Sequence, residues 1–327
     1  MRSATRAVGE IVTPKELMVL DLTSDDAEIV GVDWIGQVYR WDRLLGRLLA
    51  DPLQVHTRTV YAMLLTPDDH EIVIGGGEGV LRRWDRVNGT PLGEPLTGHR
   101  SRIRGLAGTR DGRELVSASQ DGTARRWDRA ASSWIGEPLR GHAGTVRAVA
   151  LTSDEDVIVT AGQDSTVRRW NRAACTQIGE PFIGHHGPVQ AIATAPDGRS
   201  IASGGRDGTV RRWDLASGRQ VGPPLVADSP VWSLLLTSDG EIAAGSAHGL
   251  LHRWDRTGQR IGAPVAAHAW GVASFAATRD ESELVTCGWD KRIRRWARVT
   301  GEPTRSARKE TRIDLVSRLE ITGTTPF

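Results

Sequence analysis

The sequence contains very little lysine and very little cysteine. Lysine occurs only at positions 15, 291 and 309, so nearly all of the 42 basic residues are arginine. The two cysteines, Cys175 and Cys287, are too few for a disulfide framework, and no Cys/His spacing is typical of a metal site. We therefore expect neither a metal nor a cofactor.

The chain also lacks long apolar runs and a strong net charge. No stretch of 18 apolar residues occurs, and the N-terminal residues lack the continuous apolar core of a secretory signal, which predicts a cytoplasmic protein that does not bind membranes. A formal net charge of +2 supplies little long-range attraction and disfavours nucleic acid as a partner. There is no nucleophile elbow, and the Gly-rich segment at 75–79 opens no helix, which disfavours a phosphate-binding loop.

Tryptophan, in contrast, recurs at a nearly constant interval. An Arg-Trp dipeptide places its tryptophan at positions 41, 84, 127, 170, 213, 254 and 296. Each unit contains short apolar or alternating runs separated by turn residues, which predicts three strands and a fourth outer one. A single such sheet cannot bury its two apolar faces, whereas seven sheets packed radially can. We predict an all-β, seven-bladed β-propeller of four-stranded antiparallel blades.

Either end of the chain could close the predicted ring. Residues 8–15 align with residues 92–99 of the repeat and carry apolar residues at the expected places, whereas residues 302–309 do not. We predict that residues 5–12 pair with the last Trp-bearing strand. The domain assignment is a propeller over residues 1–303 and a C-terminal extension over residues 304–327, in which residues 311–321 alternate well enough to add one strand.

The repeat resembles the Trp-Asp (WD) repeat family of propellers over residues 8–297. The resemblance is carried by Gly-His at 98–99, 141–142 and 184–185, by the Asp-Gly turns and by the terminal Trp-Asp. It implies that a His, a Ser or Thr, the turn Asp and the Trp form a hydrogen-bonded set in each blade. The complete sets are His99, Ser117, Asp121, Trp127; His142, Thr160, Asp164, Trp170; His185, Ser203, Asp207, Trp213; and His268, Thr286, Asp290, Trp296. Because the set repeats at fixed spacing, we interpret it as packing rather than as a hydrolase triad.

Three blades depart from this pattern. Blade 1 has Lys15, Gly31 and Ile35 at the three polar positions. Blade 2 keeps His56 but has Ile74 and Glu78 at the other two, so we interpret both blades as degenerate copies of the repeat. In blade 6, Asp228 and His248 have exchanged places and Ala244 replaces the hydroxyl. The exchange is either a structural swap or an Asp-oriented imidazole that could move a proton or bind an anion.

The arginine before each scaffold tryptophan needs a partner of its own. Alternation places it on the opposite sheet face from the tryptophan, and acidic residues of the outer-strand motif could pair with it. The predicted partners are Glu10, Asp51, Glu94, Glu137 and Glu180.

The resemblance also implies which face binds partners. Propellers of this family commonly use the top face, formed by the turn after Gly-His and the turn between the second and third strands. Four of the five tryptophans outside the scaffold map there, on neighbouring blades 6, 7 and 1, and arginines occupy the opposite sector. The candidate ligand- or partner-binding residues are Trp34, Tyr61, Arg102, Arg104, Arg147, Arg206, Trp232, Trp270 and Trp289. The alternative is that Trp270 and Trp289 only pack on neighbouring loops.

Two functions follow from this arrangement. The first is a monomeric, non-catalytic scaffold that binds a protein or peptide on the top face, for example a peptide with an apolar anchor and acidic residues. The second is a small-molecule-binding protein or enzyme with a Trp-lined pocket and His248 and Asp228 as the acid-base pair. We favour the first, and the sequence does not name the partner.

Overall fold

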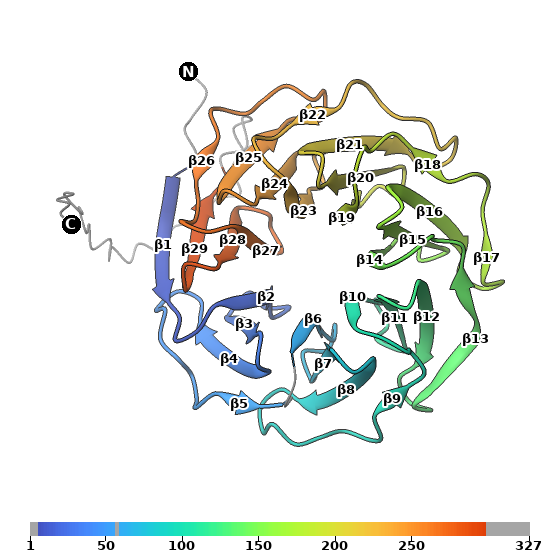
Figure 1. Ribbon diagram of the computed structural model, residues 1–327. Helices are drawn as coiled ribbons and strands as arrows, with labels where there is room; N and C mark the ends of the chain where they lie inside the picture. Colours follow the sequence, from blue (N-terminus) through green and yellow to red (C-terminus); the bar gives the residue numbers. More distant parts are fainter. Residues whose placement is uncertain (1–5, 56–58, 299–327) are drawn as a thin grey trace, which may run out of the picture.

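The computed structural model describes residues 6–55 and 59–298 and shows seven antiparallel sheets arranged around a central opening (Figure 1). Blades 1 to 3 contain β2 (Leu17–Leu22), β3 (Glu28–Asp33), β4 (Gln37–Asp42) and β5 (Leu53–Gln54); β6 (Val60–Leu65), β7 (Glu71–Gly76), β8 (Val80–Asp85) and β9 (Leu96–Thr97); and β10 (Ile103–Gly108), β11 (Glu114–Ser119), β12 (Thr123–Asp128) and β13 (Ser133–Arg140). Blades 4 and 5 contain β14 (Val146–Leu151), β15 (Val157–Gly162), β16 (Thr166–Asn171), β17 (Thr176–Gln177) and β18 (Phe182–Ile183); and β19 (Val189–Thr194), β20 (Ser200–Gly205), β21 (Thr209–Asp214) and β22 (Leu225–Val226). Blades 6 and 7 contain β23 (Val231–Leu236), β24 (Ile242–Ser246), β25 (Leu250–Trp254) and β26 (Val265–Ala266); and β27 (Val272–Ala277), β28 (Glu283–Gly288), β29 (Arg292–Ala297) and β1 (Arg6–Val12). The predicted seven-bladed fold is confirmed.

The second strand of each blade is buried on both faces because every sheet is packed between two others. In β7, for example, Ile72, Val73 and Ile74 are all fully buried. Hydrophobic clusters join adjacent blades: one combines Leu20 and Trp41 of blade 1 with Val285 of blade 7. The ring therefore holds its core between blades rather than within any one of them.

The outer strands are short and interrupted. Trp41, Trp84, Trp213 and Trp254 each form an isolated bridge to the outer segment, which then leaves the sheet and returns as a two-residue strand. In blade 4 the same interruption separates β17 from β18, whereas β13 and β1 run unbroken over eight and seven residues.

The N-terminal strand closes the ring, as predicted. β1 pairs antiparallel with β29, and Ile11 lies opposite Ile293. Ile11 is buried in the cluster shared with blade 1, whereas the neighbouring Val12 is exposed. The predicted C-terminal extension at 304–327, with its possible strand, lies outside the described residues.

Every innermost strand has a register irregularity at its second residue. The seven residues without a partner at this point are Met18, Tyr61, Arg104, Arg147, Gln190, Trp232 and Ala273. A β-bulge changes the direction of a side chain. These bulged residues lie at one end of the central opening, so the repeat presents seven variable positions there.

The arginines before the scaffold tryptophans do not pair with the outer-strand acids, so that prediction is wrong. Instead five of the seven reach an acid at the start of the second strand of their own blade, as Arg126 does with Glu114 at 2.6 Å and Arg295 with Glu283 at 2.8 Å. The remaining pairs of this kind are Arg40–Glu28, Arg83–Glu71 and Arg253–Glu241. Arg169 and Arg212 donate to backbone carbonyls of the next blade. Among the predicted partners, Glu10 pairs with Arg292 and Arg294 instead.

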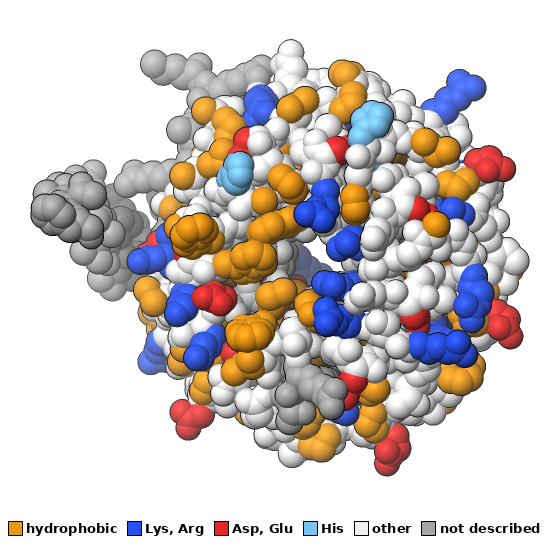
Figure 2. All heavy atoms as spheres, in the orientation of Figure 1, with side chains coloured by type: hydrophobic (Ala, Val, Ile, Leu, Met, Phe, Trp, Pro, Cys, Tyr) orange, Lys and Arg blue, Asp and Glu red, His pale blue; other side chains and the backbone are white. Residues whose placement is uncertain are grey.

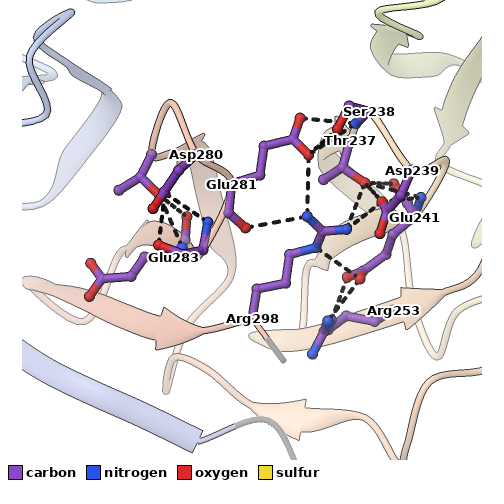
Figure 3. A network of polar contacts seen from close by, with 11 residues as sticks. Thr237, Ser238, Asp239, Glu241, Arg253, Asp280, Glu281, Glu283 and Arg298 are labelled. Atoms are coloured by element: carbon purple, nitrogen blue, oxygen red, sulfur yellow. Dashed lines mark hydrogen bonds and ion pairs between the residues drawn. The ribbon is translucent and has the colours of Figure 1, made fainter. Parts of the chain in front are cut away.

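A second arginine, two residues after each of several scaffold tryptophans, ties neighbouring blades through the same carboxylates. Figure 3 shows the junction of blades 6 and 7, where buried Arg298 contacts Glu241, Asp239 and Glu281. Burial alone would lower the pKa of Arg298, but these carboxylates outweigh it and raise the pKa. Arg43, Arg86, Arg129 and Arg172 make the equivalent contacts to Glu283, Glu28, Glu71 and Glu114.

Candidate functional site

The four complete polar sets form continuous hydrogen-bonded chains. In blade 3, His99 Nδ1 lies 2.8 Å from Asp121 Oδ2, His99 Nε2 lies 2.7 Å from Ser117 Oγ, and Trp127 Nε1 donates to the same hydroxyl at 2.8 Å. Blades 4, 5 and 7 repeat the geometry with the residues expected for them. The hydroxyl that a hydrolase would use as its nucleophile is fully buried in each set, which leaves no room for a substrate.

The surroundings of these sets shift the pKa values of their carboxylates and imidazoles. Burial lowers the pKa of His185 and His268, and the partner carboxylates oppose this only in part. Burial would raise the pKa of Asp290, but hydrogen bonds from His268 and Arg294 outweigh it and hold the pKa at about 2. The pKa shifts of these groups favour one protonation state near neutral pH, which suits a fixed hydrogen-bonding pattern rather than proton transfer.

Blade 6 contains a polar chain that differs from the predicted one. Asp228 is bonded to exposed His248 at 3.2 Å, but its shorter bond, at 2.6 Å, is to Nε2 of fully buried His252. Arg260 Nη1 donates to His252 Nδ1 at 3.0 Å, so the neutral imidazole carries its proton on Nε2 and donates it to Asp228. Burial would raise the pKa of Asp228, but hydrogen bonds from His252 and Ser246 outweigh it and lower the pKa.

Blade 1 has also replaced the lost set rather than merely lost it. The Tyr39 hydroxyl lies 3.1 Å from Oδ2 of fully buried Asp33, and the Tyr39 ring stacks on Trp41 with centroids 5.5 Å apart. His252 stacks on Trp254 in the same way, at 5.6 Å. Sequence reasoning missed both substitutes, although Tyr39 and His252 are the two positions at which Arg does not stand two residues before the scaffold tryptophan.

In blade 2 the hydroxyl of the polar set is lost, and no described residue replaces it as a partner of the scaffold tryptophan. With Ile74 in place of the hydroxyl, the buried Nε1 of Trp84 has no hydrogen-bond partner among the described residues. Glu78 forms an ion pair with Arg82. His56 lies outside the described residues.

A cavity of about 540 Å³ opens between blades 7, 1 and 2 at the end of the ring that carries the bulged residues. Its walls contain three of the predicted tryptophans, Trp34, Trp270 and Trp289, together with Tyr61 and three further residues, Glu16, Met18 and Thr59. The three tryptophan residues remain 40–69% exposed. Because large aromatic side chains gathered on one surface usually mark an interface, we name this aromatic cavity as the first half of the candidate site.

Trp232 supports the cavity from behind. It is absent from the lining, but its ring lies 4.6 Å from that of Trp289. Gly271, at φ 35°, makes this possible, because a Cβ there would lie 2.2 Å from the Trp232 ring. Trp232 therefore holds Trp289 in place rather than facing the cavity itself.

The second half of the candidate site is a set of arginines that pair with no carboxylate of residues 6–55 and 59–298. Arg104 and Arg147 border a second cavity of about 210 Å³, lined by the innermost strands, and Arg102 and Arg206 are exposed beside them. Burial lowers the pKa of Arg147, and the charges of Arg104 and Arg206 lower it further. The buried Nε atoms of Arg104 and Arg147 have no hydrogen-bond partner among the described residues. An anion placed here would relieve this repulsion.

The two halves meet at Tyr61. The guanidinium of Arg104 lies 4.3 Å from the centre of the Tyr61 ring, and that of Arg102 lies 5.7 Å from it. Figure 2 shows the same division: hydrophobic side chains gather over β2 and β27, and Lys and Arg side chains border the opposite side of the opening over β10 and β14. Trp134 lies apart on β13 of the outer rim, where it packs under Arg125.

The acid-base pair of the alternative function is not in the aromatic cavity. Neither Asp228 nor His248 lines it. His248 is exposed, as proton exchange would require, yet its carboxylate partner is held by His252 and has a lowered pKa. Among residues 6–55 and 59–298 there is no group of three potential metal ligands and no helix long and apolar enough to cross a membrane.

Comparison with known protein families identifies the repeat. The family model described as WD40, the WD domain or G-beta repeat, matches residues 89–128, 135–171, 175–214 and 262–297. These segments end on the Trp-bearing strands of blades 3, 4, 5 and 7, the four blades with complete polar sets. The comparison with curated proteins gave no match. The four matches and the seven-bladed ring together show that the chain belongs to the WD-repeat β-propeller family.

Proposed function

We propose that the protein is a non-catalytic scaffold that binds a peptide segment of a partner protein across the bulged end of the central opening. WD-repeat propellers typically serve as protein-interaction scaffolds. The observation that carries the proposal is the aromatic cavity beside unpaired arginines. An extended peptide would place an anchor side chain among Trp34, Trp270 and Trp289 and acidic residues on Arg104 and Arg147.

The fixed geometry of the site supports binding rather than turnover. Trp289 packs against Trp232 and Tyr61 stands at the bulge of β6, so ordering these two side chains costs little conformational entropy when a partner docks. The arginines would speed association with an acidic segment and make the affinity depend on salt.

The proposal is tested by capturing partners from the native cell on wild-type protein and then measuring the affinity of the recovered partner. Trp289→Ala should weaken that affinity by at least about tenfold, because aromatic anchors commonly contribute about 2 kcal/mol or more. Trp232→Ala should have a similar effect through loss of support for Trp289.

The matched control is Trp134→Ala, which removes another exposed tryptophan, from the outer rim. It should leave the affinity unchanged. If Trp289→Ala and Trp232→Ala are folded and bind the partner as tightly as wild type, the proposal is wrong.

A further inference from the structure

The described wall of the aromatic cavity contains one carboxylate, Glu16, and no described residue pairs with it. Glu16 lines the cavity beside Met18 and the tryptophans, and its side chain is partly buried. Among the described residues it has no hydrogen bond and no ion pair, whereas Glu28, Glu71, Glu114, Glu241 and Glu283 are all paired with arginine. Among the described residues, the only charged group in the cavity wall is thus the carboxylate of Glu16.

The aromatic walls have the same electrostatic preference as Glu16. The face of an indole ring carries negative potential and attracts a cation, most strongly when water is excluded. Such a contact already exists at the edge of the cavity, where Arg104 lies over Tyr61. Trp34, Trp270 and Trp289 are exposed and contribute to the cavity wall.

A neutral apolar anchor would be a poor match for this cavity. It would strip water from Glu16 and offer nothing in return, and desolvation of an unpaired charge is costly. An anionic anchor would be repelled. A cationic side chain would replace the lost water with an ion pair and would gain attraction from the rings.

We therefore propose that the anchor bound by the aromatic cavity is a cationic side chain, an alkylammonium or guanidinium group of the partner peptide. This inference rests on the proposed function and specifies its ligand: a segment with a positive charge at the cavity and negative charges at Arg104 and Arg147. A volume of about 540 Å³ accommodates such a side chain together with its flanking backbone.

The test compares two probes of the same shape and different charge. One is N-acetyl-trimethyllysine methylamide, and the other is its neutral analogue in which carbon replaces the quaternary nitrogen. Binding is followed by tryptophan fluorescence and by the indole N–H signals in NMR spectra. The charged probe should bind at least about tenfold more tightly, a difference of about 1.4 kcal/mol.

Glu16→Gln should reduce the affinity for the charged probe several-fold and leave the neutral probe unaffected, and Trp134→Ala should change neither. The inference is overturned if the two probes bind equally, if the charged probe does not bind, or if Glu16→Gln has no effect. Loss of partner capture in Trp289→Ala alongside any of these results would leave the proposed function standing. Normal capture by that variant would reject the proposed function itself.

Discussion

At the scale of single residues, the scaffold tolerates different solutions to one problem, the polar groups beside a buried tryptophan. Blades 3, 4, 5 and 7 use His, Ser or Thr, and Asp. Blade 1 uses Tyr39 with Asp33, and blade 6 uses His252 with Asp228. In both substitutes an aromatic ring stacks on the tryptophan and donates a hydrogen bond to a carboxylate. The fold thus requires that buried polar atoms have hydrogen-bond partners, and which residues supply those partners is secondary.

Asp21 is a carboxylate whose hydrogen bonds do not offset the effect of its burial. Burial raises its pKa from 3.8 to about 6, against the opposing hydrogen bonds of the Leu22 and Leu65 backbones. Between these two values the folded state binds the proton more tightly than the unfolded chain, so this group's contribution to stability falls as pH rises from about 4 to above 6.

Asp21→Asn should therefore stabilise the protein at pH 7.5, by about 1–2 kcal/mol, because the neutral amide removes the cost of a partly buried charge. Near pH 4 the gain should disappear. Calorimetric melting at the two pH values measures both effects, with Asp51→Asn, which changes an exposed carboxylate of the same blade, as a comparison for charge alone. An unchanged or lower melting temperature for Asp21→Asn at pH 7.5 contradicts the prediction.

At the scale of elements, neighbouring blades are joined in two ways. At five junctions a buried or partly buried glutamate binds an arginine of its own blade and one of the next. At the junction of blades 4 and 5 the corresponding residues are Val157 and Leu215, and Arg169 donates to the backbone carbonyls of Leu215 and Ala216. Apolar packing thus replaces an ion pair at an equivalent place in the same ring.

The apolar junction can be transplanted to the junction of blades 3 and 4. Glu114→Val alone should cost about 3–5 kcal/mol, because Arg126 and Arg172 lose a carboxylate that is buried with them. Adding Arg172→Leu should recover at least half of this loss, since Arg126 can then donate to backbone carbonyls as Arg169 does. Denaturant unfolding of both variants and of Arg172→Leu alone completes the cycle; strictly additive effects would show that the junction is not a unit.

The elements were predictable because each is encoded seven times. The spacing of the scaffold tryptophans predicts the blades, and the apolar pattern at Ile11 predicts the closing strand. The partners of Arg126 and Arg295 were not predictable, because they depend on cross-strand register: each acid lies diagonally across from its arginine, two residues from the position directly opposite. Nor could sequence show that Trp232 would lie behind Trp289, since this depends on a bulge and on the absence of a side chain at Gly271.

At the scale of the whole molecule, closure by β1 joins the beginning of the described chain to its end. Ile11 packs among residues of blades 1 and 7, so β1 links two blades as well as completing one sheet. In a closed ring, opening one junction exposes the apolar faces of both sheets that meet there. Packing by β1 therefore contributes to the stability of the whole ring.

Ile11→Ala should lower the stability of the whole ring by about 2–5 kcal/mol, the range for truncating a buried isoleucine. Val12→Ala, on the exposed face of the same strand, should have little effect. Hydrogen exchange would locate the change, with the largest loss of protection in β29 and β28. Equal melting temperatures for the two variants would mean that the closing strand contributes little.

The pairing of β1 with β29 also has a consequence for biosynthesis. About 280 residues separate the two strands, so at roughly 5–20 residues per second the ribosome makes the partner of β1 some 15–60 s after β1 itself. Throughout that interval β1 is an unpaired edge on an incomplete chain. The irregularity at Val8 and the charge of Glu10 are the kinds of feature that discourage such an edge from pairing with another nascent chain.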